Sequence, residues 1–457
     1  MKLKSLEIKN LRCFEAYKID FTPKTTIIIG RNGAGKSTLI DAIKIAMSFI
    51  FSNNKKLGKD FLSAGNPSLN VNTFADTDFR YDSEQGTTAP DASVKGLACY
   101  NGRTLEWELY KRSTSNASLY TTKYQKAFDA FMDEWKNKGA DLPLIACFSD
   151  SFPHKATKQT SFAINSILKD KMQRNFGYYQ WNLDTACTSV WENRLCNQLA
   201  HIAPMYGRAE SSATFATLHD EIEYVQNRLV RLSQRLPKLT DEQYDIDYLV
   251  AVDTGRCYEL SIVFKNGRSK LLSELPAGYC RLYSIVLDLA YRAYILNGNK
   301  EPSGIVLIDE IDLHLHPSLE QEVVQCLGEI FPQVQFIMTS HSAAVIANLD
   351  TTEMAADVET GEPVRANQVV FMQDGQTEAD VLPVIYGLDY NAALRDFMGS
   401  DSRNAEMKKK GDEYLTYCSL GMEKEAQSII SRMTEALGAE HNYVKELKEK
   451  AKAYEIH

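Results

Sequence analysis

Several patterns that mark specialised proteins are absent from this sequence of 457 residues. The nine cysteines are scattered, and no two stand at C-x-x-C spacing, which indicates reduced thiols rather than a disulfide framework. No apolar run approaches the roughly 18 residues of a membrane-spanning helix, and the first residues lack the apolar core of a signal peptide. We therefore expect a cytoplasmic protein with no membrane contact.

An excess of positive charge is missing as well. The chain carries 51 Lys and Arg residues against 60 Asp and Glu residues, a formal net charge of −9. No overall basic field therefore draws the protein to nucleic acid or anionic lipid, so any DNA contact would use a local patch. Hydrophobic residues make up 44% and charged residues 24%, the balance of a globular protein with ample material for a core.

Hydrophobic periodicity predicts the α/β class. The first 50 residues read as strands followed by an amphipathic helix. Further along, strands at 305–308 and 336–339 alternate with helices at 282–296 and 317–331. Such alternation implies a largely parallel sheet covered by helices.

Two Asn-Gly pairs, Asn101-Gly102 and Asn266-Gly267, lie between apolar segments and predict β-hairpins. We expect type I′ turns at both, because Asn and Gly tolerate positive φ. Between the hairpins, apolar residues fall at helical spacing, as at Leu218, Ile222 and Val225. After about residue 375 no further strand is predicted, and the chain continues as a polar helical tail.

The segment Gly30–Ser37 fits G-x-x-x-x-G-K-[ST] without a mismatch, after an apolar strand and before a helix. Glycines let consecutive backbone N–H groups wrap a polyphosphate, and the helix N-terminus adds positive potential. Lys36 is expected to reach the β- and γ-phosphates of ATP, and the Ser37 hydroxyl to ligate Mg²⁺.

Two later strands end in polar residues. Asp309 and Glu310 follow the apolar run from Gly304, at the edge where α/β sheets place ligands. Asp309 is expected to hold Mg²⁺, and Glu310 to polarise the attacking water. The segment Phe336–Ser342 ends a third strand and carries His341, which is expected to contact the γ-phosphate or that water.

These three motifs, in this order and with a large insertion between them, resemble the ABC-type ATPases of the SMC/RecF group. The resemblance covers about 1–50 and 260–375. Within the group, the segments 275–297 and 384–400 look most like the PtuA family, the ATPases of bacterial Septu and related retron anti-phage systems.

The resemblance implies roles for further residues. The ABC signature falls at Leu275–Tyr279. Gly278 matches the glycine that approaches the nucleotide bound to the opposite subunit. Pro276 and Ala277 depart from the common Ser-Gly pattern. Asp312 matches the D-loop position, while no residue is assigned to the glutamine loop. The complete expected set of nucleotide contacts is Arg12, Gly30, Asn32, Gly33, Ala34, Gly35, Lys36, Ser37, Thr38, Gly278 and Asp312.

The resemblance also implies an organisation and partners. We expect an ATPase head built from 1–115 and 251–375, a mainly helical insertion at 116–250, and a helical tail at 376–457 that docks a partner. Two heads would sandwich ATP in a homodimer or a higher oligomer. The partner would be an HNH-type, PtuB-like nuclease, and in a retron also a reverse transcriptase with its nucleic acid.

Other functions stay open at this point. A RecF-like DNA-repair ATPase would need a basic track, and Lys408–Lys410 is either a DNA contact or a solvated face. A transporter subunit fits the large insertion poorly, and a scaffold with dead ATP sites fits poorly with intact Lys36, Asp309 and Glu310. The sequence shows no convergent set of metal ligands for phosphodiester cleavage, so we expect no intrinsic nuclease activity.

Overall fold

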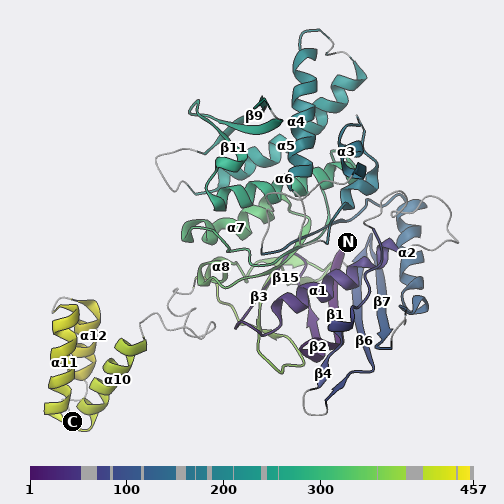
Figure 1. The fold of residues 1–457 in the computed structure, drawn as a ribbon. Coiled ribbons are helices and arrows are strands. Elements are labelled where there is room, and N and C mark those ends of the chain that lie inside the picture. The colour runs from purple at the N-terminus through teal and green to yellow at the C-terminus, as the bar shows by residue number, and fades with distance from the viewer. Residues whose placement is uncertain are drawn as a thin grey trace. The chain divides into compact units, whose positions relative to one another are not determined.

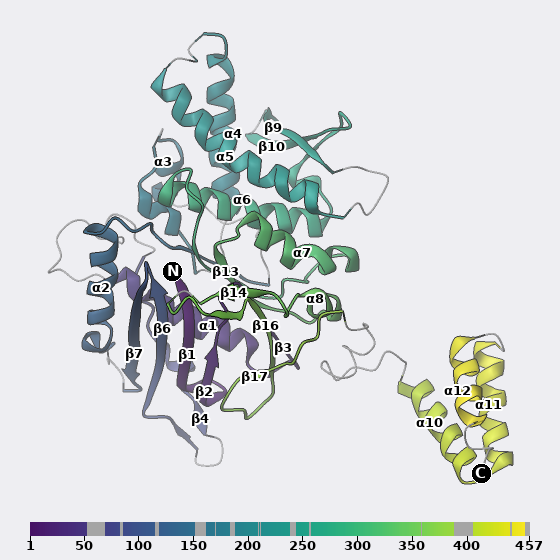
Figure 2. The ribbon, with the colours of Figure 1, turned by 180° about the vertical axis from the view of Figure 1, so that it is seen from behind.

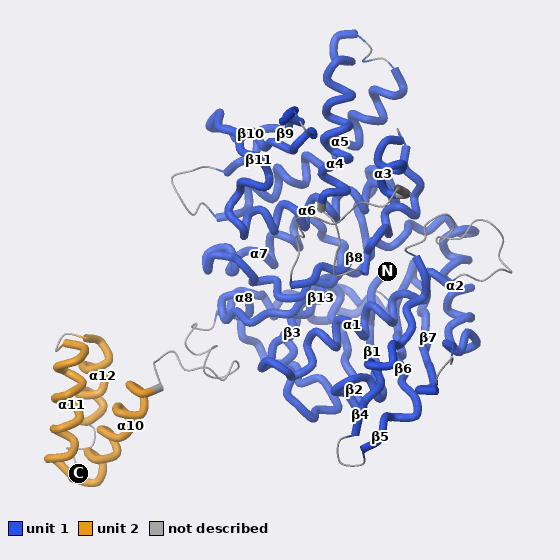
Figure 3. Tube along the Cα trace, viewed as in Figure 1, with its two compact units in different colours: residues 1–388 blue, residues 389–457 orange. Residues whose placement is uncertain are grey.

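The computed structural model divides into two compact units, residues 1–388 and 389–457, which are described separately (Figure 3). The structure describes residues 1–52, 69–82, 86–114, 118–150, 161–169, 171–182, 188–208, 210, 212–237, 244–255, 257–357, 359–387, 405–438 and 441–452. Within these ranges, none of the helices has the length and apolar character needed to cross a bilayer.

Six strands form the central sheet of the first unit, in the order β17-β16-β3-β13-β12-β8 (Figures 1 and 2). Their bounds are β3 Thr25–Gly30, β8 Leu144–Phe148, β12 Gly304–Ile308, β13 Val334–Thr339, β16 Asn367–Met372 and β17 Asp380–Val381. All of them run parallel except β17, which pairs antiparallel with β16. Strands β3, β12 and β13 are wholly buried, as expected for a parallel sheet covered on both faces.

The register of this sheet brings three strand ends to one edge. Ile308 of β12 pairs with Met338 of β13, and Met338 pairs with Ile27 of β3. The residues that follow β3, β12 and β13 therefore emerge side by side, where α/β sheets place their ligands.

A second sheet, in the order β2-β1-β6-β7, is antiparallel. Its strands are β1 Lys2–Leu11, β2 Phe14–Asp20, β6 Asp91–Tyr100 and β7 Arg103–Arg112. Helix α1 (Lys36–Met47) packs against β3 of the first sheet and β6 of the second, and the Trp107 indole donates to Ala46 O at 2.8 Å. Asn101 (φ 52°) and Gly102 (φ 75°) both lie in the left-handed region, so the predicted hairpin between β6 and β7 is confirmed.

A helical lobe follows, and its centre is helix α6, which is buried along nearly its whole length. Helices α4 and α5 pack on α6, and a small sheet in the order β11-β10-β9 packs on α4 and α5 (Figure 1). The bounds are α4 Thr188–Ile202, α5 Ala213–Arg235, α6 Ala277–Asn297, β9 Ile246–Asp253, β10 Tyr258–Phe264 and β11 Ser269–Leu271. Leu218 and Val225 of α5 are buried, in agreement with the predicted helical stripe.

The remaining elements of the first unit are shorter or peripheral. Helix α2 packs against β7, and α7 packs on α8 (Figures 1 and 2). Their bounds, with those of the other small elements, are α2 Gln125–Lys136, α3 Ser161–Ile167, α7 Pro317–Ile330, α8 Ala343–Asn348, β4 Tyr81–Asp82, β5 Thr87–Thr88, β14 Met354–Ala356 and β15 Pro363–Arg365.

The range 116–250, predicted as a mainly helical insertion, also contains a strand of the central sheet. This range contributes β8, which pairs in parallel with β12 and belongs to the central sheet. The five residues of β8 are all buried and apolar, but periodicity alone does not distinguish so short an apolar run from a segment of a buried helix. Helix α2 precedes β8 in this range, and helices α3, α4 and α5 follow it.

A correction concerns the hairpin at Asn266-Gly267. The hairpin between β10 and β11 is present, but only Gly267 has a positive φ (78°), so the turn is not type I′. The Gly267 N–H donates to Phe264 O at 2.9 Å, which closes a turn over Lys265 and Asn266 and leaves Gly267 in the left-handed position. Another prediction, that no strand follows residue 375, misses the short β17.

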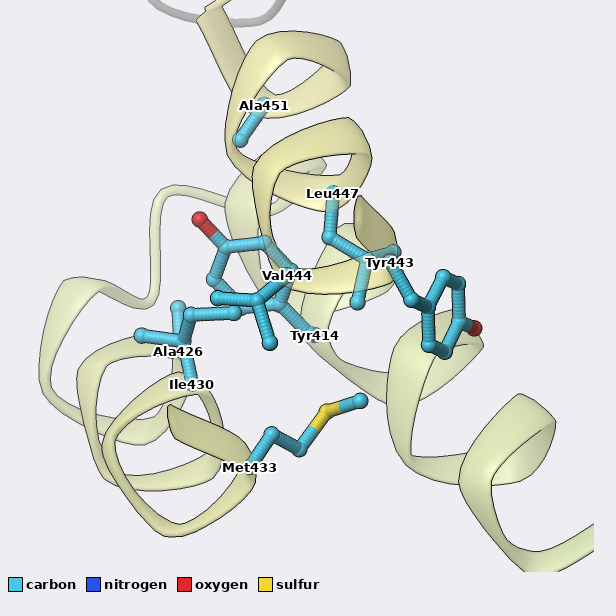
Figure 4. Packing of buried hydrophobic residues seen from close by; sticks show 8 residues of the cluster. All are labelled: Tyr414, Ala426, Ile430, Met433, Tyr443, Val444, Leu447 and Ala451. Atoms are coloured by element: carbon cyan, nitrogen blue, oxygen red, sulfur yellow. The ribbon is translucent and has the colours of Figure 1, made fainter. Parts of the chain in front are cut away.

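Within 405–438 and 441–452, the second unit forms helices α10 Ala405–Ser419, α11 Glu423–Leu437 and α12 Asn442–Lys452, in agreement with the helical character predicted for the tail. Side chains from all three helices meet in a small core (Figure 4). That core consists of Tyr414, Ala426, Ile430, Met433, Tyr443, Val444, Leu447 and Ala451. Gly411 lets α10 and α12 approach closely, because a Cβ there would lie 2.0 Å from the Tyr443 hydroxyl oxygen.

Candidate nucleotide-binding site

The loop from Gly30 to Gly35 joins β3 to α1 at the edge of the central sheet. Gly33 (φ 87°) and Gly35 (φ 95°) lie in the left-handed region that favours glycine. A Cβ on Gly35 would also lie 2.8 Å from Cys13 Sγ, so both the backbone angle and the available space require glycine there. The loop therefore has the conformation that lets its backbone N–H groups face an anion.

Lys36 is the first residue of α1 and is only 7% exposed. Its Nζ atom donates to Gly30 O at 2.9 Å and to Arg31 O at 3.1 Å, so the ammonium group lies over the loop. Burial lowers the pKa of Lys36, and the carboxylates of Asp309 and Glu310 oppose this effect. Nearby in the loop and helix, Asn32, Gly33 and Ser37 are exposed, whereas Ala34 is buried and Thr38 is half-buried.

Asp309 and Glu310 follow β12 and are held by the neighbouring strands. The Asp309 N–H donates to Phe148 O at 2.8 Å, and the Thr339 hydroxyl donates to Asp309 Oδ1. The Glu310 N–H donates to Thr339 Oγ1 at 2.8 Å. Glu310 has a φ of 52°, a conformation uncommon for residues other than glycine and often found at functional sites.

A fully buried arginine lies beneath these carboxylates. Arg281 comes from α6, just after the signature segment, and donates to the backbone oxygens of Asp309 (3.0 Å), Glu310 (2.9 Å) and Asp150 (3.0 Å). Burial lowers the pKa of Arg281, and nearby carboxylates, led by Asp312, oppose the effect. The sequence assigns no role to Arg281, because its contacts are with segments far away in the sequence.

Asp312 and His341 are brought together. The His341 N–H donates to both carboxylate oxygens of Asp312, at 3.2 and 3.3 Å, so Asp312 holds the backbone after β13. Ser342 follows as the N-cap of α8, and its hydroxyl donates to Glu320. The segment that carries His341 is therefore tied to the segment after β12 within one chain.

Gly278 lies at the N-terminus of α6 and is buried. A Cβ there would lie 2.8 Å from His314 O and 3.2 Å from Leu315 Cδ2, so glycine permits close packing on the segment after Asp312. The expected contact of Gly278 with the nucleotide of an opposite subunit stays a prediction, as does the D-loop role of Asp312.

Arg12 occupies the turn between β1 and β2, beside the phosphate loop, with a φ of 48°. Its guanidinium group bonds to Asp41 Oδ2 of α1 at 2.6 Å and to Asp78 Oδ1 at 2.8 Å. The side chain is 40% exposed, so it is anchored by two carboxylates while one face stays open to solvent. Its expected contact with nucleotide also stays a prediction.

The donor set at this edge fits ATP with Mg²⁺. The glycine loop and Lys36 supply N–H groups and a cation for phosphate oxygens. The Ser37 hydroxyl and the Asp309 carboxylate are the hard oxygen ligands that Mg²⁺ prefers. Glu310 is a half-buried carboxylate whose backbone is held on both sides, which suits a group that polarises water.

The sequence matches the family described as AAA ATPase domain over residues 1–346. The probable ATPase of retron Vc95 from Vibrio cholerae serotype O1 biovar El Tor is 26% identical over 392 residues, 78% of this chain and 73% of that protein. The Septu protein PtuA of Bacillus thuringiensis is 21% identical over 425 residues, 88% of this chain and 90% of that protein. Among solved structures, an SMC head bound to the C-winged helix domain of ScpA matches with 16% identity and a TM-score of 0.46. The match covers 84% of this chain and 98% of the SMC head chain.

Proposed function

The chain belongs to the family of AAA ATPase domains, and on that premise we propose that it is the ATP-binding and ATP-hydrolysing regulatory subunit of an anti-phage defence complex. The observation that carries the proposal is the shared sheet edge, where the phosphate loop, the Asp309–Glu310 pair and His341 meet. Similarity to a retron ATPase and to a Septu protein PtuA supports the defence role.

In this proposal the phosphate loop and Lys36 bind the triphosphate of ATP. The Ser37 hydroxyl and the Asp309 carboxylate hold Mg²⁺, which neutralises phosphate charge when it is bound. Glu310 accepts a proton from the attacking water, and His341 donates a hydrogen bond at the γ-phosphate. The placement of these residues at one edge of the sheet supports the proposed roles.

We further propose that two heads form a homodimer around ATP, with Gly278 and Asp312 facing the partner subunit. Hydrolysis would then open the dimer and change the surface offered to an effector. The effector in this proposal is an HNH-type nuclease, PtuB-like, and in a retron setting also a reverse transcriptase with its nucleic acid. The proposed docking element is the second unit, whose described helices form their own core, and the helical insertion is the alternative.

The test compares the protein alone with the protein plus its nuclease partner. Alone, highly pure protein is expected to leave plasmid and single-stranded DNA or RNA intact in Mg²⁺ or Mn²⁺, with or without ATP. With the nuclease partner, cleavage should appear and should depend on nucleotide, so Lys36→Ala should alter it. Nicking by the pure protein that disappears with a point change in this chain would contradict the proposal.

A second candidate is a RecF-like DNA-repair ATPase that binds DNA directly. A RecF protein of Lactococcus lactis subsp. lactis is 46% identical, but only over 43 residues, 9% of this chain. This function predicts direct, salt-dependent DNA binding by the protein alone, which a binding titration at two salt concentrations would detect.

A further inference from the structure

Thr339 lies between the two functional strands of the sheet. It is the last residue of β13, is fully buried, and pairs with Ile28 of the phosphate-loop strand. The preceding residue, Met338, pairs with Ile308 of β12, so Thr339 stands level with Asp309. Thr339 lies within the predicted segment Phe336–Ser342, but the sequence assigns a role there only to His341.

The hydroxyl of Thr339 makes two hydrogen bonds, one to each member of the acidic pair. It donates its proton to Asp309 Oδ1, and it accepts the Glu310 N–H at 2.8 Å. The first bond engages Asp309 Oδ1, whereas Asp309 Oδ2 accepts no hydrogen bond from the described residues. The second bond holds the backbone at the point where Glu310 adopts its left-handed φ of 52°.

Other contacts hold the same turn, but each through a main-chain oxygen. The Ile311 N–H donates to Thr339 O at 3.0 Å, and Arg281 donates to Glu310 O at 2.9 Å. Among the described residues, the Thr339 hydroxyl is the side-chain group that bonds both to the Asp309 carboxylate and to the Glu310 backbone. One hydroxyl therefore couples the orientation of the expected metal ligand to that of the expected base.

We propose that Thr339 is a positioning residue of the nucleotide site, an inference that rests on the proposed ATPase function. By donating to Oδ1 it presents Asp309 Oδ2 to Mg²⁺, and by accepting from Glu310 it aims the Glu310 side chain. Groups that orient a metal ligand in this way commonly contribute about 10- to 100-fold to metal affinity or activity.

The experiment replaces the hydroxyl with a methyl group of nearly the same shape. In Thr339→Val, the Mg²⁺ concentration that half-saturates ATP binding should rise by about tenfold or more, and kcat should fall by about 10- to 100-fold with a smaller change in KM. Thr339→Ser keeps the hydroxyl and should restore both quantities. Amide hydrogen exchange at Glu310 should be faster in Thr339→Val than in the wild type, a readout that needs no nucleotide.

Thr26→Val is the matched control, because Thr26 is also fully buried in this sheet and its hydroxyl accepts from the Gln368 side chain at 3.2 Å. It lies near the opposite end of β3 from the phosphate loop, so it should lower the melting temperature without changing the Mg²⁺ requirement. If Thr339→Val does not fold, Thr339→Ala removes the same hydroxyl group and introduces a smaller side chain.

Three outcomes decide between the hypotheses. A Mg²⁺ requirement that changes in Thr339→Val, recovers in Thr339→Ser and stays normal in Thr26→Val supports the proposal. A Thr339→Val protein that binds ATP and Mg²⁺ like the wild type overturns it while leaving the ATPase function standing. A wild-type protein that binds no ATP overturns both.

Discussion

Two buried arginines on the same helix, α6, illustrate how differently the two ends of this helix are built. Arg292 lies in the helical lobe, where Asp288 balances its charge and where Gly177 O (3.0 Å) and Tyr179 O (2.8 Å) accept further bonds. The Asp288 carboxylate in turn accepts from the Trp191 indole at 2.6 Å. Every charge in this cluster therefore has a direct partner.

Among the described residues, Arg281 at the other end of α6 has no carboxylate as a direct partner. It bonds to three backbone oxygens, and within the described ranges no carboxylate lies at ion-pair distance and its Nε has no hydrogen-bond partner. Its charge instead acts at longer range on the carboxylates after β12, which oppose the burial that lowers its pKa. In the lobe, a direct ion pair balances the buried arginine. At the sheet edge, the described carboxylates act on Arg281 only at longer range, beneath the residues proposed for catalysis.

The largest expected effect on stability comes from removing the carboxylate that pairs with Arg292. Asp288→Leu leaves Arg292 charged and buried without a carboxylate, so the free energy of unfolding should fall by about 3–5 kcal/mol. Urea denaturation would measure this loss. The double variant Asp288→Leu with Arg292→Met should recover most of it.

An exposed pair gives the scale for that result. Lys410 and Glu406 form an exposed i,i+4 ion pair on α10, and Glu406→Gln should change the urea denaturation curve far less than Asp288→Leu does. If Asp288→Leu cost no more than this exposed control, the balanced-cluster account of the lobe would be wrong.

Lys2 adds a third case to the comparison of the two arginines, because it is a partly buried cation whose charge can be removed by titration. Burial, aided by Lys24, lowers the pKa of Lys2 from 10.5 to about 8. Below pH 8 the folded and unfolded states both hold the proton, so the cost of burying the charge is present in full. Between pH 8 and 10.5 the unfolded state alone holds it, and above 10.5 neither does, so the cost disappears as pH rises.

Lys2→Met should therefore raise the free energy of unfolding by about 3 kcal/mol at pH 7, at about 1.4 kcal/mol per pKa unit. The gain should shrink in denaturation curves measured between pH 8 and pH 10. If the gain in unfolding free energy stayed constant from pH 8 to pH 10, removal of the buried Lys2 charge would not be its cause.

Arg281 should show a small effect on stability and a large one on turnover. Arg281→Met removes bonds to three carbonyls but also removes a buried, unpaired charge, so the net change in unfolding free energy should be about 1–2 kcal/mol. ATP hydrolysis should fall much further, because the Glu310 backbone loses an anchor. Thermal denaturation and steady-state ATPase rates, measured on one preparation, would separate the effect on stability from the effect on turnover. If stability and turnover fell to the same extent, Arg281 would be a stabilising residue like Arg292.

The sequence predicts the parts of this molecule that depend on local pattern. The phosphate loop, Asp309–Glu310 and the strand before His341 were found because each motif has a fixed spacing within a few residues. Strand β8 was missed because five apolar residues surrounded by polar sequence carry too little periodicity. The turn at Asn266-Gly267 differed because the dipeptide is compatible with more than one hairpin geometry.

Thr339 and Arg281 could not be found in this way. Both act on Asp309 and Glu310 from segments about 30 residues away in the sequence, and their contacts exist only once β12, β13 and α6 are assembled. Such residues carry no spacing rule, so their roles emerge only from three-dimensional contacts.

The most direct test of the central claim, that Glu310 acts as the base at an ATP site, is the single-turnover rate of Glu310→Gln with ATP and Mg²⁺. The amide preserves the shape of the side chain but is a much poorer proton acceptor, so ATP should still bind while hydrolysis falls by about 100-fold or more. Light scattering should show a dimer that persists with ATP in this variant and that Lys36→Ala cannot form. Hydrolysis by Glu310→Gln at the wild-type rate would contradict the account.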